Sequence, residues 1–365
     1  MARCNFTSTA SWLAIDNDRK AQRITPLKPA LLPLTLFMAV TTSIPCAETP
    51  PTKPAGLRPG DTIMLVAPAG ELDRERVERV QQRLEALGFR VIVPETLFRR
   101  RGYLAGTDQQ RANELMAAFK NPNVNAIFPG RGGYGTTRML DLLDYDVIKA
   151  NPKILIGFSD ITGLHLALAK KCNLITFHSP VAQHGLGSPD GLSEFSAKYF
   201  WRCLLADENS GDAGFEYEPP EGAPLQSLRG GKARGRLLGG NLSLVAATMG
   251  TPYEIETDGR VLFFEDVNEA PYRIDRMFSQ LKLAGKLKTP AAVILGQFTK
   301  AEPGEGDSSL TVDEIFADYF AGAAYPVVKN FPAGHAPNNA ALPMGALFEV
   351  DGNKPSVRLL ENPVR

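Results

Sequence analysis

The chain has 365 residues, which is enough for about two domains. Hydrophobic residues make up 44% and charged residues 22%, as in soluble globular proteins with packed cores. Lysine and arginine together number 40, as do aspartate and glutamate, so the charge gives no support to nucleic-acid binding. Four scattered cysteines show neither a CxxC pair nor metal-ligand spacing, so they predict no disulfide framework and no cysteine nucleophile: Cys4, Cys46, Cys172 and Cys203.

Residues 1–55 have the composition of a leader and linker. Basic residues between Arg19 and Lys28 precede an apolar run at 30–40, and small residues follow at 41–47. This order is typical of a secretory signal peptide, and the apolar run is too short to span a membrane. We therefore expect an exported, periplasmic protein. A cytoplasmic protein is the alternative, because Pro45 is unusual so close to a cleavage site.

From Asp61 onwards, strand and helix patterns alternate. The sequence predicts strands at 62–67, 90–94 and 126–128, and helices at 73–87 and 108–120. Such βαβ units build a mostly parallel sheet that binds ligands at the carboxyl ends of its strands. Turns at 68–70, 129–135 and 157–160 fall at such ends, so we expect the functional site there.

The segment 153–162 is the most informative of these turns. A short apolar strand runs into Gly157, a Ser159-Asp160 pair follows, and a helical pattern covers 161–170. A serine at a sharp strand-to-helix turn is the geometry of a nucleophile elbow. Because Ser-Asp before a helix is also an ordinary N-cap, this segment leaves both interpretations open.

Four glycines lie between the strand at 126–128 and a predicted helix at 136–143, in the sequence Gly130-Arg131-Gly132-Gly133-Tyr134-Gly135. Glycines let a backbone approach a ligand closely, which suits a phosphate loop or an oxyanion-binding turn. No Walker lysine is present, and a glycine turn without a ligand is the third possibility.

The second half carries less regular patterns. Residues 206–230 are rich in Gly, Pro, Glu and Ser and read as an interdomain linker. Helices at 242–249 and 273–283, an apolar strand that ends in acids at 261–269, and a strand at 291–295 then predict a smaller, strand-rich domain. Glu265, Asp266 and Glu269 cluster at a strand end, but no histidine lies near them in the sequence, so we predict no metal site.

The four histidines differ in what surrounds them. His165 lies within the helix after the predicted elbow and reads as a packed side chain. His178 and His184 flank a proline-containing loop after the predicted strand 174–177, and His335 lies in a loop where nothing structural demands an imidazole. Local sequence patterns do not show which of these last three histidines is functional.

Taken together, these motifs resemble the LD-carboxypeptidase group of serine peptidases, which also contains the microcin C immunity peptidases. Five motifs carry the resemblance, in the family's order, between about Leu57 and the C-terminus: 131–135 (RGGYG), 157–160 (GFSD), 239–242 (GGNL), 265–269 (EDVNE) and 334–335 (GH). The resemblance implies an α/β fold: a Rossmann-like nucleophile domain, predicted at 56–205, and a smaller β-rich domain at 231–365, commonly as a homodimer.

The resemblance also implies roles for individual residues. Ser159 would be the nucleophile, with Glu265 and His335 as acid and base. The backbone N–H groups of Asp160 and of Gly132 or Gly133 would form the oxyanion hole, and no metal or organic cofactor would be needed. The same motifs predict substrate contacts from a further four residues: Arg131, Tyr134, Asn241 and Glu269.

The activity implied is release of the terminal D-alanine from the L-centre of a murein tetrapeptide, in murein recycling or remodelling. The immunity branch, which acts on aminoacyl-nucleotide conjugates, is one alternative. For that branch Phe215 and Tyr217 are the loose aromatic candidates for stacking on a base. A general α/β-hydrolase esterase and a non-catalytic periplasmic binding protein are the others, but Ile161 replaces the second glycine of an esterase G-x-S-x-G elbow.

Overall fold

The computed structural model describes residues 49–206, 214–304, 306 and 308–365. The predicted leader, up to residue 48 and with Cys4 and Cys46 in it, lies outside the described residues. No helix in the described ranges combines the length and the apolar character needed to cross a membrane.

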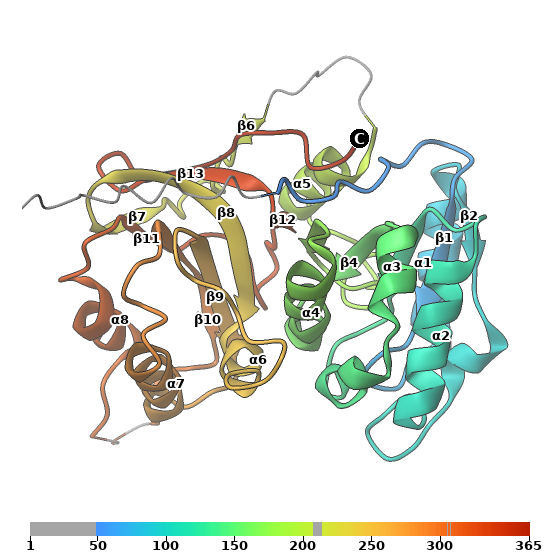
Figure 1. Cartoon of the computed structure of the whole chain (residues 1–365), viewed down its shortest axis with the longest axis horizontal. Coiled ribbons are helices and arrows are strands. Elements are labelled where there is room, and N and C mark those ends of the chain that lie inside the picture. The colour runs from blue at the N-terminus through green and yellow to red at the C-terminus, as the bar shows by residue number, and fades with distance from the viewer. Residues whose placement is uncertain (1–48, 207–213, 305, 307) are drawn as a thin grey trace, which may run out of the picture. The chain divides into compact units, whose positions relative to one another are not determined.

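A six-stranded sheet forms the centre of the first half (Figure 1). Its strands have the order β12-β5-β4-β3-β1-β2. They are β1 (Thr62–Val66), β2 (Arg90–Ile92), β3 (Ala126–Pro129), β4 (Ile154–Gly157), β5 (Thr176–His178) and β12 (Leu342–Met344). All neighbours pair in parallel except β12, which runs antiparallel to β5. The predicted mostly parallel sheet is confirmed.

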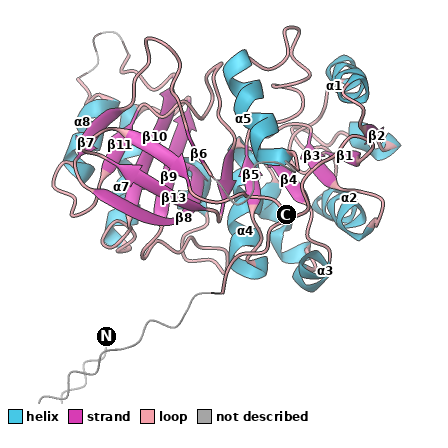
Figure 2. Cartoon of the chain, turned by 90° about the horizontal axis from the view of Figure 1, so that it is seen from above, coloured by secondary structure: helices cyan, strands magenta, loops and turns pink. Residues whose placement is uncertain are grey.

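Helices cover both faces of this sheet, as the view from above shows (Figure 2). Alternate strand residues explain why: Ile63 and Leu65 pack on the side of α1 and α5, whereas Met64 and Val66 pack on the side of α2 and α4. The helical segments of this half are α1 (Arg74–Ala86), α2 (Asp108–Lys120), α3 (Tyr145–Ala150), α4 (Thr162–Cys172), α5 (Glu194–Leu204) and the 3₁₀ turns η1 (Glu95–Phe98), η2 (Thr136–Leu142) and η3 (Ser159–Ile161).

An eight-stranded mixed sheet dominates the second half, in the order β6-β14-β13-β8-β9-β10-β11-β7. Its strands are β6 (Phe215–Glu216), β7 (Gln226–Arg229), β8 (Lys232–Asn241), β9 (Val261–Val267), β10 (Ala292–Thr299), β11 (Val327–Lys329), β13 (Leu347–Asp351) and β14 (Ser356–Leu359). Apolar residues of β9 and β10 pack against α6 (Leu242–Ala247), α7 (Pro271–Leu283) and α8 (Val312–Phe320). This is the β-rich second part that the sequence predicts.

Three features differ from the sequence-based expectations. Residues 136–142 form a 3₁₀ turn rather than an α-helix, and Gly135, at φ 136°, gives it no side-chain cap. The predicted linker 206–230 contains β6 and β7, which are edge strands of the second sheet. β12 belongs to the predicted C-terminal domain in sequence but joins the first sheet. The domain limits proposed from sequence therefore stay a prediction.

Candidate active site

A strained turn presents Ser159 at the carboxyl end of β4. The residue has φ 62°, a left-handed conformation that is uncommon for any residue other than glycine. Gly157, at φ 151°, allows the chain to reverse, since a Cβ there would lie 2.9 Å from Cγ1 of Ile161. The turn therefore has the strand–strained serine–helix geometry of a nucleophile elbow.

His165 supports this turn from within α4. The ring is buried, and its Nε2 lies 2.7 Å from the Gly157 carbonyl oxygen and its Nδ1 2.8 Å from Oγ1 of Thr176. Burial lowers the pKa of His165 to about 3, so the imidazole is neutral and Nε2 donates to the carbonyl. The interpretation of His165 as a packed side chain agrees with these contacts.

His335 and Glu265 form a hydrogen-bonded pair, with 2.7 Å between Nδ1 of the imidazole and Oε2 of the carboxylate. Glu265 lies on β9 and is fully buried, whereas His335 follows Gly334 in the loop after β11. Gly334 has φ 138°, and a Cβ on it would lie 3.1 Å from Oε2 of Glu265. The glycine therefore permits the close approach of the histidine loop to the carboxylate.

A second histidine lies on the other side of that carboxylate. His178, fully buried on β5, places Nε2 3.8 Å from Oε1 of Glu265. Burial acts to raise the pKa of Glu265, but His178 and His335 outweigh it and hold the pKa at about 2. Glu265 is therefore a carboxylate between two imidazoles, an arrangement that orients His335 and stabilises its protonated form.

The glycine loop, residues 130–135, lies directly against the elbow at Ser159. A Cβ on Gly132 would be 2.9 Å from Cβ and 3.0 Å from Oγ of Ser159, and 3.2 Å from the backbone nitrogen of Asp160. The Asp160 side chain fastens the two segments together, since its buried carboxylate accepts the Thr136 backbone N–H at 2.8 Å. Burial raises the pKa of Asp160, and this hydrogen bond opposes the rise. The backbone of Gly132 thus lies beside the nucleophile, and its role as an oxyanion donor stays a prediction.

A cavity of about 570 Å³ contains the serine and the histidine. Its wall is formed by the glycine loop, the elbow, the segment after β5 and the histidine loop: Arg131, Gly132, Gly133, Phe158, Ser159, Pro180, Val181, His184, Gly191, Leu192, Ser193, Ser196, Val267, Gly334, His335, Ala336, Pro337 and Asn339. Segments far apart in the sequence thus meet at one site, which has the volume of a small-ligand pocket.

Of the four residues predicted to contact the substrate, Arg131 lines this cavity. Tyr134 is 47% exposed and packs edge-on against Tyr103. Asn241 is buried, caps α6 and donates to Asp266 at 3.0 Å, and Glu269 lies 3.4 Å from Arg273 in an ion pair. The substrate contacts of all four residues stay predictions, and Arg131 is the one of the four that lines the cavity.

The acidic cluster that follows β9 is divided among separate partners. Glu265 faces His335, Glu269 pairs with Arg273, and Asp266 accepts hydrogen bonds from Ser243 at 2.8 and 2.9 Å. Within the described ranges, no three His, Cys, Asp or Glu side chains gather in a way that could hold a metal ion. Each of these carboxylates thus has a structural or orienting contact of its own.

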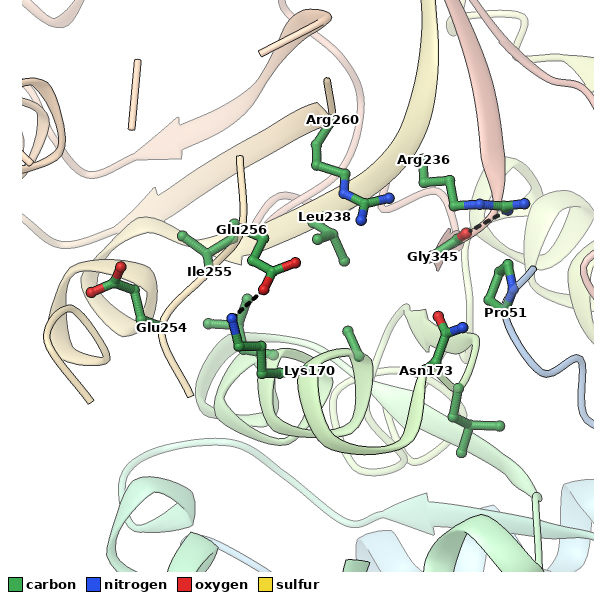
Figure 3. A pocket seen from close by; sticks show the side chains of 13 residues that line it. Pro51, Lys170, Asn173, Arg236, Leu238, Glu254, Ile255, Glu256, Arg260 and Gly345 are labelled. Atoms are coloured by element: carbon green, nitrogen blue, oxygen red, sulfur yellow. Dashed lines mark hydrogen bonds and ion pairs between the residues drawn. The ribbon is translucent and has the colours of Figure 1, made fainter. Parts of the chain in front are cut away.

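A second, smaller cavity of about 50 Å³ lies between α4 and β8 (Figure 3). Its charged side chains already have partners: Lys170 pairs with Glu256, and Arg236 donates to the Gly345 carbonyl at 3.1 Å (Figure 3). None of the predicted triad residues lines it. The cavity that holds Ser159 is therefore the candidate active site.

Comparisons with known proteins agree with this geometry. The family model described as the LD-carboxypeptidase N-terminal domain matches residues 63–179, and the model described as the LD-carboxypeptidase C-terminal domain matches residues 234–350. The chain is 38% identical over 296 residues to a probable murein peptide carboxypeptidase of Bacillus subtilis (80% of this chain, 90% of that protein). It is 36% identical over 299 residues to the murein tetrapeptide carboxypeptidase of Pseudomonas aeruginosa (80% and 94%). A solved structure of the microcin C7 self-immunity protein MccF with aspartyl sulfamoyl adenosine superposes with a TM-score of 0.79 at 27% identity (86% and 100%).

Proposed function

Because this chain belongs to the LD-carboxypeptidase family and is a serine-type carboxypeptidase, we propose that it releases the terminal D-alanine of murein tetrapeptides by hydrolysing the L,D peptide bond. The observation that carries the proposal is the hydrogen bond between buried Glu265 and His335, because His335 lines the same cavity as the strained Ser159. The names of the relatives from Bacillus subtilis and Pseudomonas aeruginosa support murein peptides as the substrate class.

The first half of the reaction forms an acyl-enzyme. Nδ1 of His335 donates to Glu265, which leaves Nε2 free to take the proton of the Ser159 hydroxyl as Oγ attacks the scissile carbonyl carbon. His335 then gives this proton to the amine of D-alanine as the peptide bond breaks. The ionised Glu265 stabilises the imidazolium while it exists.

The second half returns the free enzyme. Water attacks the ester at Ser159 with His335 again as base, and the shortened peptide leaves with a new carboxylate. In both halves the negative oxygen is met by the N–H of Asp160 and an N–H from Gly132 or Gly133. Each such donor contributes about 3–4 kcal/mol of transition-state stabilisation.

The similarity to MccF supplies a second candidate, hydrolysis of aminoacyl-nucleotide conjugates. A base-binding site of that kind needs an accessible aromatic side chain. Phe215 and Tyr217, the candidates from sequence, are 7% and 2% exposed and pack against Tyr199 in the core. These contacts favour murein peptides over nucleotide conjugates.

The experiment is a direct competition between the two substrate classes. Purified protein is incubated with L-Ala-γ-D-Glu-mDAP-D-Ala and, separately, with aspartyl sulfamoyl adenosine, and free D-alanine and free aspartate are measured. We expect D-alanine from the tetrapeptide and a far slower release of aspartate. Aspartate release without any D-alanine would contradict the proposal and support the second candidate.

We also propose that the protein is exported and forms a homodimer. The basic and apolar leader motivates export, and the family resemblance motivates the dimer. A reporter enzyme that is active only outside the cytoplasm should become active when fused after Pro54. Light scattering of the mature protein should give twice the mass of one chain. A mature chain that begins at Met1 in the cytosol would contradict export, and a monomer would contradict the dimer.

A further inference from the structure

Arg131 is a cation without a partner in the active-site cavity. Its Nε is buried and has no hydrogen bond, and the guanidinium makes no ion pair with the residues that the structure describes. Arg111, which is fully buried, shows the usual alternative: it pairs with Asp108 and donates to the Gly135 carbonyl at 2.8 Å. Arg131 is partly buried, and taking a charge out of water without a partner is costly, so this unpartnered arginine points to a missing anion.

The cavity has no negative side chain to supply that anion. Neither aspartate nor glutamate is among its lining residues, and its other titratable groups are His184 and His335. The acids next to the elbow and the histidine have other partners, since Asp160 accepts from Thr136 and Glu265 is hydrogen-bonded to His335. The pKa of His184 is lowered by burial and also by the charge of Arg131, as expected for a cation close to the same wall. The cavity therefore suits a negatively charged ligand.

Arg131 also adjoins, in sequence, a residue that lies beside the nucleophile. It directly precedes Gly132, the residue whose backbone lies against Ser159. Its side chain turns towards the end of β1, where a Cβ on Gly70 would lie 3.1 Å from Nε. The Arg131 side chain thus lies at the same sheet edge as the nucleophile, and Arg131 is next in sequence to the predicted oxyanion donor.

We infer that Arg131 binds the carboxylate of the substrate's C-terminal residue and so restricts the enzyme to release of the last residue. The inference rests on the proposed function and adds a specificity determinant to it. The leaving group is a single amino acid, so its carboxylate lies close to the scissile bond. A guanidinium can hold a carboxylate by two parallel hydrogen bonds. An amidated or extended peptide places no carboxylate there and leaves the partly buried arginine unpaired.

The test compares the tetrapeptide acid with its C-terminal amide, using wild type, Arg131→Gln and Arg131→Lys. Arg90→Gln is the matched control, because Arg90 is exposed at the start of β2. A site built around a charged contact rejects an analogue without it by about 100-fold or more in kcat/KM. Wild type and Arg90→Gln should show this preference for the acid. Arg131→Gln should lose it through a slower reaction with the acid alone, and Arg131→Lys should restore part of it.

The outcomes separate this inference from the proposed function. If wild type releases D-alanine and Arg131→Gln keeps the full preference, the inference is wrong and the proposed function stands. If Arg131→Gln reacts more slowly with acid and amide by the same factor, Arg131 has a structural role and the inference is again wrong. If wild type releases no D-alanine from the acid, both are wrong. Thermal unfolding of each variant identifies any that fails to fold. If Arg131→Gln does not fold, Arg131→Lys, which keeps the charge, takes its place: a reduced acid-to-amide ratio in kcat/KM supports the inference, and the full wild-type ratio contradicts it.

Discussion

Gly132→Ala adds one methyl group at the most crowded point of the predicted oxyanion hole. The new Cβ would lie 2.9 Å from Cβ of Ser159 and 3.2 Å from the Asp160 nitrogen. Non-bonded carbon atoms normally keep about 3.5–4.0 Å, so the loop or the serine must move by roughly half an ångström or more. Gly132 itself does not have a positive φ, so steric crowding rather than backbone strain is the expected effect.

The expected consequence is a large loss of rate with a modest loss of stability. Displacing one oxyanion donor lowers kcat by about 100–1000-fold, which corresponds to roughly 3–4 kcal/mol. Overpacking costs about 1–3 kcal/mol of folding free energy, so the variant should still fold at assay temperature. Steady-state release of D-alanine measures the first effect, and calorimetry measures the second.

Gly322→Ala is the control, because a Cβ on Gly322 meets nothing within 4 Å. It should leave both kcat and the melting temperature near those of wild type. A folded Gly132→Ala variant with kcat within tenfold of wild type would refute the placement of Gly132 in the oxyanion hole.

Glu265→Gln and His335→Ala should each lower kcat nearly as far as Ser159→Ala, and the double variants no further, because the three side chains act as a unit. Additive losses in kcat would contradict this. The pKa of Glu265 is about 2 instead of 4.5, so its contribution to stability is complete above pH 4.5 and is lost as the pH falls towards 2. His178→Phe should move that loss to higher pH in thermal unfolding, and an unchanged pH curve would rule out the contribution of His178. EDTA should leave the rate unchanged, since Asp266 is bound by Ser243; inactivation that zinc reverses would instead indicate a metal site.

The first sheet could be predicted from sequence because its signals are local. The N-caps Asp73 and Thr107 immediately precede α1 and α2, and the strands β1 and β3 on either side of these helices are short apolar runs. The position of β12 depends on pairing with β5 across nearly half the chain, and β6 and β7 lie in a polar stretch without periodicity. Such long-range pairings leave no local pattern to read.

In the candidate site, too, some residues have a local sequence signal and others do not. Ser159 stands out because glycine, serine and a helix start are adjacent in sequence, whereas Glu265 and His335 are 70 positions apart and were paired only through the family resemblance. The position of His178 beside Glu265 could not be predicted, since it depends on how β5 and β9 pack. The unpartnered state of Arg131 likewise becomes visible only when its surroundings are known.

The most direct test of the account is the release of D-alanine from L-Ala-γ-D-Glu-mDAP-D-Ala by wild type and by Ser159→Ala, compared at equal concentrations of folded protein. Wild type should release D-alanine and, after a rapid quench, carry the acyl tripeptide on the peptide that contains Ser159. Ser159→Ala should do neither. Release by Ser159→Ala within tenfold of the wild-type rate, or an acyl group on any other residue, would contradict the assignment of Ser159 as nucleophile.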